Sequence, residues 1–397
     1  MWQGRRVVLG VTGGIAAYKC VLLARDLARR GAQVDVVMSR GAAEFVGAVT
    51  FEAMTRRPVR SSLWERNGAL DHVVLGQHAD LIIVAPATAH FLARAAAGIA
   101  DDLLTSIVLA STAPILIAPA MNDAMFANPA TQSNLRRLGS RGWRSVGPAV
   151  GELAEGPSER PGRMAGVEEI LAHGARVLHA PSALAGRRIV VTAGPTREAI
   201  DPVRVLTNRS SGKMGYRLAE AAWQRGASVT LISGPSSELA PVGVDIVRVE
   251  TTAQMVSAVR ESLAGSDVLI MAAAPADYRP LRPRADKLPR SDGGFALELG
   301  ATEDILLATA ADRPADLIAV GFALETGNAI EKGRDKLQRK QLDMIVVNDA
   351  LEPGAGFDVD TNAVTILDRR GRAERVPLRS KAAVAEAILD AIEKYRE

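Results

Sequence analysis

The sequence has few of the residues on which several classes of protein depend. Its 397 residues include one cysteine, Cys20, which excludes a scaffold held by internal disulfides and a zinc site built on paired cysteines. Aromatic residues make up 4% of the chain, which argues against a surface that stacks nucleic-acid bases. No apolar run approaches the roughly 18 residues of a membrane span, so we expect a cytoplasmic protein with no membrane partner.

Charge of one sign is also scarce. The 48 basic and 45 acidic residues leave a net charge of +3, too small an excess to indicate a nucleic-acid partner. The glycine turn after the first apolar run does not match GxGxxG, and the chain lacks GxxxxGK[ST], so a dinucleotide fingerprint and a P-loop are both disfavoured. With 48% hydrophobic residues the chain can bury sizeable cores, and its length suits two domains.

Short β-branched runs alternate with longer amphipathic segments, which is typical of an α/β fold with a buried parallel sheet. Helical patterns cover residues 16–31, 90–110 and 167–179. Strands are predicted over Arg6–Val11, Gln33–Met38, Asp80–Pro86, Pro114–Pro119, Arg187–Thr196, Ser228–Ser233, Ser266–Asp277, Leu317–Thr326 and Met344–Asp349.

The strand–glycine–helix pattern starts twice. Between the two starts, residues 151–163 (GELAEGPSERPGR) are rich in Gly, Pro and Glu and are predicted to form a potentially mobile loop, and 180–186 reads as a polar joint. We therefore predict two Rossmann-like α/β domains in tandem with mainly parallel sheets, a flavodoxin-like domain over 1–180 and a nucleotide-binding domain over 186–397.

Three turns with short side chains follow consecutive strands of the first half. Because the carboxyl ends of parallel strands meet at one edge, these turns are expected to converge where open α/β folds bind ligands. Glycines there let the backbone approach a phosphate, and the shortness of the first turn favours a mononucleotide such as FMN. A tight turn without a ligand is the alternative. The residues concerned are Gly13, Gly14, Ser39, Pro86, Ala87 and Thr88.

Longer motifs carry a resemblance to known families. GVTGGIAAYK, DHVVLGQHADLIIVAPATAHFLARAAAGIADDLLT and APAMNDAMFANPA resemble flavin-dependent cysteine decarboxylases. TAGPTREAIDPVRVLTNRSSGKMG, AAAPADYRP, GFALET and KLQRKQLDMIVVND are similar to phosphopantothenate–cysteine ligases. The likeness covers nearly the whole chain and implies a bifunctional enzyme of coenzyme A biosynthesis. Such an enzyme would make 4′-phosphopantetheine from 4′-phosphopantothenate, cysteine and CTP.

In the first half, the resemblance assigns proton handling to His72 and the substrate carboxylate to Asn122, with FMN as cofactor. A saturated cysteinyl carboxylate has no electron sink. Transfer of hydride to flavin makes the thiol-bearing carbon a thioaldehyde, carbon dioxide can then leave, and the same flavin reduces the resulting enethiol.

One position departs from the family pattern. Relatives commonly have a cysteine in an ACG context ahead of GRM, as the proton donor for that last reduction. Here the aligned residues are Ala154, Glu155 and Gly156, so Glu155 stands in the place of the cysteine. Either Glu155 or water supplies the proton, or the reduction is slow. His90 and Phe126 also differ from the residues most usual in the family.

In the second half, a ligase needs cations for a triphosphate and a metal ion. Lys336 and Lys340 are four residues apart and would share one face of a helix; a merely solvated face is the alternative. The resemblance places both on CTP and implies Mg²⁺, with metal ligands unknown, whereas the residues alone do not choose CTP over ATP. It associates Asn208 with the acyl-cytidylate step. The family pattern normally has a proline at the position of Glu303. The other nucleotide contacts it implies are Lys287, Asp277, Met271, Ala272, Ala273, Glu303, Asp304, Ile305, Leu306 and Phe322.

The resemblance further implies homo-oligomers, with trimers of the first domain, often joined into a dodecamer, and dimers of the second. Two alternatives stay open. One is an active ligase whose first half is a flavin-binding scaffold with weak decarboxylase activity because of Glu155. The other, a non-catalytic flavoprotein or nucleic-acid-binding regulator, has little support from the nearly balanced charge.

Overall fold

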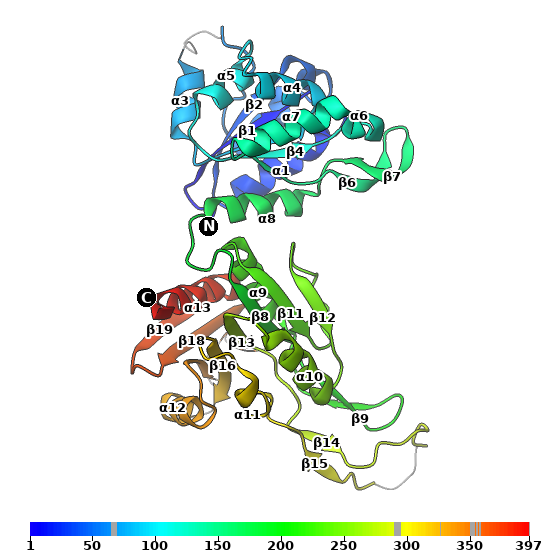
Figure 1. The fold of residues 1–397 in the computed structure, drawn as a ribbon, viewed down its shortest axis with the longest axis vertical. Helices are drawn as coiled ribbons and strands as arrows, with labels where there is room; N and C mark the ends of the chain where they lie inside the picture. Colours follow the sequence, from blue (N-terminus) through cyan, green and yellow to red (C-terminus); the bar gives the residue numbers. More distant parts are fainter. Residues whose placement is uncertain are drawn as a thin grey trace. The chain divides into compact units, whose positions relative to one another are not determined.

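The computed structural model describes residues 1–64, 70–289, 295–325, 327–349, 354, 356 and 359–396. The chain forms two compact units, Met1–Ala180 and Pro181–Glu397, each with its own sheet (Figure 1). Within the described segments, none of the helices is long and apolar enough to cross a membrane.

The first unit is built on a five-stranded parallel sheet in the order β2-β1-β3-β4-β5. This order is that of flavodoxin-like folds, and it confirms the predicted α/β class. The strands are almost continuously apolar because helices cover both faces, and every residue of β3 is buried. The strands are β1 (Arg6–Val11), β2 (Gln33–Met38), β3 (Leu81–Ala87), β4 (Ile115–Pro119) and β5 (Arg144–Ser145).

The helical pattern predicted over 90–110 is interrupted. Gly98 takes a left-handed conformation that ends the first helix, and Asp102 begins the second with a capping box to Thr105. The helices of this unit are α1 (Ala17–Arg29), α2 (Ala48–Thr55), α3 (Asp71–His78), α4 (Ala89–Ala97), α5 (Leu103–Ala110), α6 (Asp123–Ala127), α7 (Pro129–Ser140) and α8 (Val167–Leu178), with a 3₁₀ turn η1 (Arg40–Glu44).

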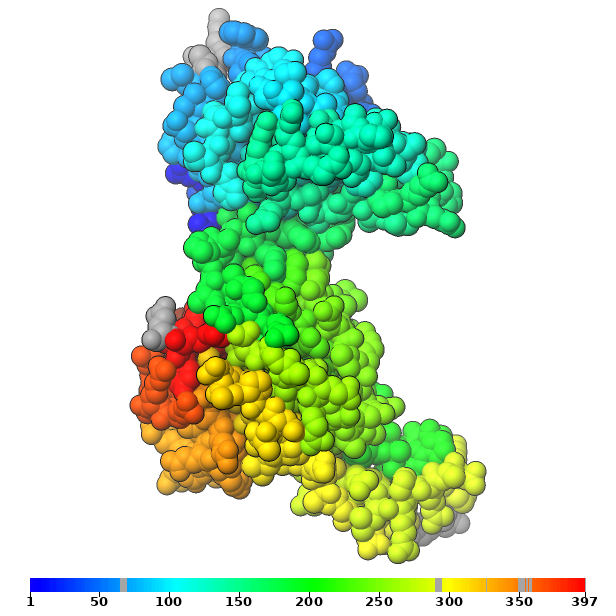
Figure 2. Space-filling view, viewed as in Figure 1, coloured from blue at the N-terminus to red at the C-terminus, as the bar shows by residue number. Residues whose placement is uncertain are grey.

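Residues 151–163 are not the irregular loop that their composition predicts. They belong to an antiparallel hairpin of β6 (Ala149–Leu153) and β7 (Gly156–Arg163), which projects from the first unit (Figures 1 and 2). The base of the hairpin is held by a hydrogen bond from the Met121 amide to the Gly162 carbonyl, at 3.0 Å. A Cβ on Gly162 would lie 2.6 Å from the Met121 carbonyl oxygen, so this docking requires glycine.

The second unit contains an eight-stranded sheet in the order β12-β11-β8-β13-β16-β17-β18-β19. The first six strands are parallel and follow the dinucleotide-fold order, while β18 and β19 add an antiparallel edge that the sequence reading did not foresee. The strands are β8 (Arg188–Ala193), β11 (Ser228–Ser233), β12 (Asp245–Arg248), β13 (Val268–Met271), β16 (Ile318–Glu325), β17 (Met344–Asp349), β18 (Thr361–Asp368) and β19 (Ala373–Ser380).

Two small antiparallel pairs form an arm that extends from the body of the second unit (Figures 1 and 2). They are β9 (Arg197–Ala199) with β10 (Val205–Thr207), and β14 (Tyr278–Pro280) with β15 (Leu299–Ala301). The strand predicted over 266–277 therefore ends at Met271, and the chain continues into this arm. The helices are α9 (Lys213–Gln224), α10 (Thr252–Leu263), α11 (Ile305–Ala308), α12 (Ala329–Arg339) and α13 (Lys381–Arg396), with a 3₁₀ turn η2 (Ala310–Asp312).

Candidate active sites

The first unit has a cavity of about 550 Å³ at the carboxyl edge of its sheet. It lies where the turns after β1, β2 and β3 meet, and the strand order reverses between β1 and β3. This is the position at which open α/β sheets bind ligands. Four of the residues predicted from the turns line it together: Gly13, Gly14, Ser39 and Thr88.

Thr12 joins the turns after β1 and β3, and the sequence reading missed it. Its Oγ1 donates to the Pro86 carbonyl oxygen at 2.6 Å, and the Thr88 amide donates to the same Oγ1 at 3.2 Å. Pro86 and Ala87 are not among the residues that line the cavity, so they support it through the backbone. A threonine between a buried strand and a double glycine was the available signal.

Charged groups at this cavity are few and partly neutralised. The Arg94 guanidinium pairs with Asp102 at 2.8 Å. Burial acts to raise the pKa of Asp102, but hydrogen bonds from Thr105 and Arg94 outweigh it and hold that pKa below its ordinary value. The exposed Arg40 also lines the cavity and supplies a cation for an anionic group. The cavity therefore combines small side chains, hydroxyls and the exposed Arg40 guanidinium.

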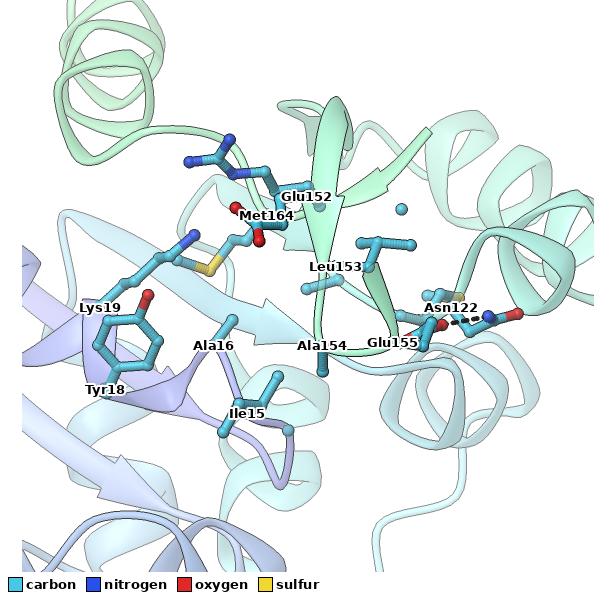
Figure 3. A pocket seen from close by; sticks show the side chains of 15 residues that line it. Ile15, Ala16, Tyr18, Lys19, Asn122, Glu152, Leu153, Ala154, Glu155 and Met164 are labelled. Atoms are coloured by element: carbon cyan, nitrogen blue, oxygen red, sulfur yellow. Dashed lines mark hydrogen bonds between the residues drawn. The ribbon is translucent and has the colours of Figure 1, made fainter. Parts of the chain in front are cut away.

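A second cavity, of about 370 Å³, lies between the start of α1, the turn after β4 and the hairpin β6–β7 (Figure 3). Gly14, Ala120 and Met121 line both cavities, so the two share a wall. Asn122 and Glu155 face each other here, and the Asn122 Nδ2 donates to the Glu155 Oε1. The structure thus brings together the predicted carboxylate-binding amide and the residue that replaces the family cysteine.

The Asn122 amide is held in one orientation by its own helix. Its Oδ1 accepts from the Ala124 amide at 2.9 Å and the Met125 amide at 3.3 Å, which caps α6. The carbonyl oxygen is therefore occupied, and the NH₂ group points into the cavity toward Glu155 (Figure 3). Asn122 can present two donors to an incoming carboxylate without adding charge.

Two cations lie in the same cavity. Lys19 comes from α1 and Arg163 from the end of β7. Burial, and then repulsion from Arg163, lower the pKa of Lys19. Glu152 and Glu155 line the same cavity, so the two cations lie among carboxylates.

His72 is not brought to either cavity within a single chain. It lies in the first turn of α3, and its buried Nδ1 has no hydrogen-bond partner among the described residues. The adjacent Asp71 pairs with Arg60 at 2.5 Å. Cys20 is fully buried in α1, where burial raises the pKa of its thiol and its Sγ donates to the Ala85 carbonyl at 2.9 Å. Cys20 therefore does not replace a flap cysteine.

In the second unit, the strand order reverses between β8 and β13. The segment after β13 carries Ala272 and Ala273, and the Ala273 amide donates to the Thr192 Oγ1 at 3.1 Å. Asn208 reaches the same segment, since its Nδ2 donates to the carbonyls of Ala274 and Pro275 at 3.2 and 2.8 Å. The structure thus brings Asn208 beside the predicted nucleotide segment at the switch point.

The two predicted nucleotide lysines each hold a carboxylate. Lys336 pairs with Glu325 at 2.5 Å, and Lys340 pairs with Asp304 at 2.9 Å. Lys336 lies in the last turn of α12 and Lys340 is its C-cap residue, whose amide donates to the Lys336 carbonyl oxygen at 3.0 Å. These ion pairs hold the Lys336 ammonium at the end of β16 and the Lys340 ammonium at the start of α11.

The remaining predicted residues occupy different environments. Ile305 and Leu306 are buried in the core, so only their backbone is available to a ligand, whereas Glu303 and Asp277 are exposed. Phe322 lines a small cavity together with Ala272 and Ala273. Across the described ranges, no group of three or more His, Cys, Asp or Glu side chains is placed to hold a metal ion.

Lys287 lies on the arm and is exposed, but its neighbour is firmly held. The Leu288 amide donates to the Asp201 Oδ2 at 3.1 Å, and the Arg204 Nη2 donates to the Leu288 carbonyl at 3.3 Å. Burial acts to raise the pKa of Asp201, but backbone hydrogen bonds from Val203, Arg204 and Leu288 outweigh it and lower that pKa. Asp201 thus fixes the backbone next to Lys287, which sequence reading missed.

Comparison with known proteins covers both units. The family model described as Flavoprotein matches residues 1–179, and the model described as DNA/pantothenate metabolism flavoprotein C-terminal domain matches residues 184–395. The chain is 45% identical over 393 residues to the coenzyme A biosynthesis bifunctional protein CoaBC of Vibrio cholerae, with 98% of both chains covered. It is 44% identical over 399 residues to CoaBC of Bacillus subtilis, covering 99% of this chain and 97% of the relative. For CoaBC of Mycobacterium tuberculosis the identity is 43% over 403 residues, covering 98% and 96%.

Proposed function

Because this chain belongs to the family of coenzyme A biosynthesis bifunctional proteins, we propose that its two units divide two reactions between them. The chain is an enzyme of coenzyme A biosynthesis with decarboxylase and ligase activities. We assign decarboxylation to residues 1–180 and ligation to residues 186–397. The observation that carries this assignment is the 45% identity that runs over 393 residues and through both units.

The ligation step joins 4′-phosphopantothenate to cysteine. A carboxylate is a poor electrophile, so a cytidylyl group from CTP first turns it into an acyl-cytidylate, from which the cysteine amine displaces CMP. Lys287, Lys336 and Lys340 would bind the nucleotide, and binding of phosphates would release Glu325 and Asp304 from their lysines. Asn208 would orient the acyl group beside Ala274. Mg²⁺ would accompany CTP, with the phosphates supplying much of its coordination.

The decarboxylation step needs a redox cofactor, and the first cavity fits FMN. Its volume of about 550 Å³ lies in the range of cofactor sites, and small residues and hydroxyls would let the backbone approach a phosphate. Gly13, Gly14, Ser39 and Thr88 would surround the mononucleotide. When bound, FMN would supply the reversible two-electron oxidation that gives the substrate carboxylate an electron sink.

The second cavity would hold the cysteinyl end of 4′-phosphopantothenoylcysteine. The Asn122 NH₂ group would leave Glu155 and donate to the substrate carboxylate, fixing the bond that breaks. Glu155 would then be free to give a proton to the enethiol carbon during the final reduction. Lys19 and Arg163 would attract the anionic substrate.

We further propose that the decarboxylase site is completed by assembly. His72 is outside both cavities of its own chain, so a catalytic role requires a second copy to bring it to them. A trimer of the first unit would satisfy this requirement. We also propose dimers of the second unit and a cytoplasmic location, on the likeness to the family.

One experiment tests the whole assignment. The purified full-length chain is expected to be yellow and to convert 4′-phosphopantothenate, cysteine and CTP to 4′-phosphopantetheine, with release of pyrophosphate. Mass spectrometry of the products, with ATP as the control nucleotide, checks this. Accumulation of 4′-phosphopantothenoylcysteine without 4′-phosphopantetheine would instead support a flavin-binding scaffold with little decarboxylase activity.

A further inference from the structure

A cavity of about 500 Å³ lies at the amino edge of the sheet in the second unit. Its walls come from the starts of β16 and β17, the turn between β18 and β19, the end of α13 and the segment after η2. Its described lining residues include none of the predicted nucleotide contacts. The cavity is therefore separate from the candidate ligase site at the switch point.

Guanidinium groups outnumber carboxylates in the described lining of this cavity. Asp343 is 7% exposed and is held by the fold, since its Oδ2 accepts from the Ala319 amide at 2.8 Å and its Oδ1 from the Tyr395 hydroxyl at 3.2 Å. Arginine stays charged at physiological pH, so an excess of arginine over aspartate attracts anions. The charged lining residues are Arg313, Arg369, Arg370, Arg396, Asp316 and Asp343.

The turn between β18 and β19 presents two of these arginines in fixed positions. The Arg369 amide donates to the Asp343 carbonyl oxygen at 3.0 Å, and its Nη1 contacts the Asp343 Oδ1 at 3.2 Å. The Arg370 guanidinium lies over the Tyr395 ring, 4.2 Å from the ring centroid. The Arg369 side chain is 66% exposed, so donors that face solvent are available to a ligand.

The shape and chemistry of the lining favour a compact anion. Leu317 and Ile318 are buried at 7% exposure each, and the buried Tyr395 ring is already covered by Arg370. Among the described lining residues there is thus no uncovered aromatic face on which a nucleotide base could stack. The planar fork of an arginine matches the oxygens of a phosphate group.

Arg313 connects this cavity to residues that are predicted to bind CTP. Its Nη1 donates to the carbonyl oxygens of Lys340 and Gln341 at 3.4 and 3.2 Å, and its Nη2 donates to the Leu306 carbonyl oxygen. Its buried Nε has no hydrogen-bond partner among the described residues. Gln341 has a φ of 51°, a left-handed conformation that is unfavourable for a residue with a side chain. Arg313 therefore helps to hold the backbone beside Lys340 in a strained conformation.

We infer that this cavity binds a compact phosphate anion, inorganic phosphate or pyrophosphate, and that the bound anion weakens the binding of CTP. A charge-assisted hydrogen bond to phosphate is stronger than one to a carbonyl, so the anion draws Arg313 from Lys340 and Gln341. The Lys340 ammonium then loses the support of its backbone. The effect on CTP rests on the proposed ligation, whereas the binding of the anion does not. Because ligation releases pyrophosphate, such a site lets a product slow the reaction.

The first test measures binding to the full-length, FMN-loaded chain without turnover. The double substitution Arg369→Gln/Arg370→Gln removes two cations, and Arg372→Gln, an exposed position in the same turn that does not line the cavity, is the matched control. Pyrophosphate and inorganic phosphate are titrated separately in a calorimeter at constant ionic strength, with saturating CTP and no 4′-phosphopantothenate. The double variant should bind the anion at least about tenfold more weakly than the wild type and Arg372→Gln. The anion that binds more tightly to the wild type is the ligand.

The second test measures CMP formation with 4′-phosphopantothenate and cysteine at several concentrations of pyrophosphate. In the wild type and Arg372→Gln, pyrophosphate should raise the KM for CTP at least about threefold more than in the double variant, where only direct competition remains. If the double variant does not fold, the exposed Arg370→Gln is used alone.

The outcomes separate the parts of the inference. Equal affinity of the double variant and Arg372→Gln for both anions would overturn the site. Weaker binding of the anion with equal rises in the KM for CTP would overturn the link through Arg313. A wild-type chain that binds pyrophosphate but forms no CMP from its substrates would refute the proposed ligation and leave the anion site standing.

Discussion

The two units begin in the same way and then diverge. In the first, β1 ends at Val11 and α1 starts at Ala17, so the turn stays short. In the second, β8 ends at Ala193 and α9 starts only at Lys213, and the residues between them build β9 and β10 of the arm. The short turn suits the binding of a mononucleotide. The long connection contributes Asp201 and Asn208 to the second unit. We propose that the same topological switch point serves a different reaction in each unit.

The charge at the two sites differs accordingly. The cavity at the switch point of the first unit is lined by hydroxyls, glycines and the exposed Arg40, with Arg94 paired to Asp102. The second unit holds Lys336 in an ion pair with Glu325 at the end of β16, and Lys340 in an ion pair with Asp304 before α11. A cofactor that carries its own reactivity needs positioning, whereas a triphosphate needs cations. Substitutions in each unit probe this division.

Asn122→Ala should have the largest effect, confined to the first unit. Loss of the donor to the substrate carboxylate is expected to lower the decarboxylation rate by about 10² to 10³, as for other preorganised donors. CTP-dependent pyrophosphate release should be unchanged. Steady-state assays of both half-reactions check this. An equal loss of activity in both would contradict the assignment of one reaction to each unit.

Glu155→Gln should slow formation of 4′-phosphopantetheine about a hundredfold, because the amide cannot supply the proton. Single-turnover release of carbon dioxide should be less affected, since it precedes the reduction. Glu152→Gln, on the same hairpin and in the same cavity, is the matched control and should leave product formation near the wild-type rate. Wild-type product formation by Glu155→Gln would assign the proton to water.

Asp201→Asn should raise the KM for CTP about tenfold, because the Leu288 amide loses its charged acceptor and Lys287 loses its fixed backbone. The effect should vanish in a Lys287→Ala background, so a double-mutant cycle separates this positioning role from general damage. Additive effects of the two substitutions would show that Asp201 acts elsewhere.

Arg225→Met should destabilise the second unit without touching flavin binding. The buried Arg225 joins α9 to α13 through Glu386, Asp390 and Glu393, and its removal takes away the guanidinium that these carboxylates share. Because the carboxylates are partly exposed, we expect a loss of about 2 kcal/mol, or about 4 to 8 °C in the melting temperature of that unit. Arg217→Met, at an exposed pair with Glu220, should cost less than about 1 kcal/mol in calorimetry.

Much of the fold could be predicted because buried parallel strands are continuous apolar runs. Arg6–Val11, Gln33–Met38, Ser228–Ser233 and Met344–Asp349 have the predicted bounds. The hairpin β6–β7 could not be foreseen, since its strands are rich in Gly, Pro and charge and are held by docking at Gly162. The edge strands β18 and β19 were missed because their pairing depends on tertiary contacts, which a local pattern does not reveal.

The candidate sites were predictable where function depends on the backbone turns after strands. Gly13, Gly14, Ser39 and Thr88 converge because parallel strands end at one edge. Thr12 and Asp201 escaped notice because their partners lie 74 and 87 residues away, at Pro86 and Leu288. Contacts between residues so far apart in the sequence form only in the tertiary structure, so local sequence patterns do not predict them.

Mixing two blocked chains tests most directly that each unit carries one complete reaction. Asn122→Ala should stop at 4′-phosphopantothenoylcysteine, and the double substitution Lys336→Met/Lys340→Met should leave 4′-phosphopantothenate unused. With 4′-phosphopantothenate, cysteine and CTP, the mixture of the two proteins should form 4′-phosphopantetheine, which neither protein forms alone. If the mixture forms none, although each variant is folded and binds flavin, the two reactions are not separable between the units and the account is wrong.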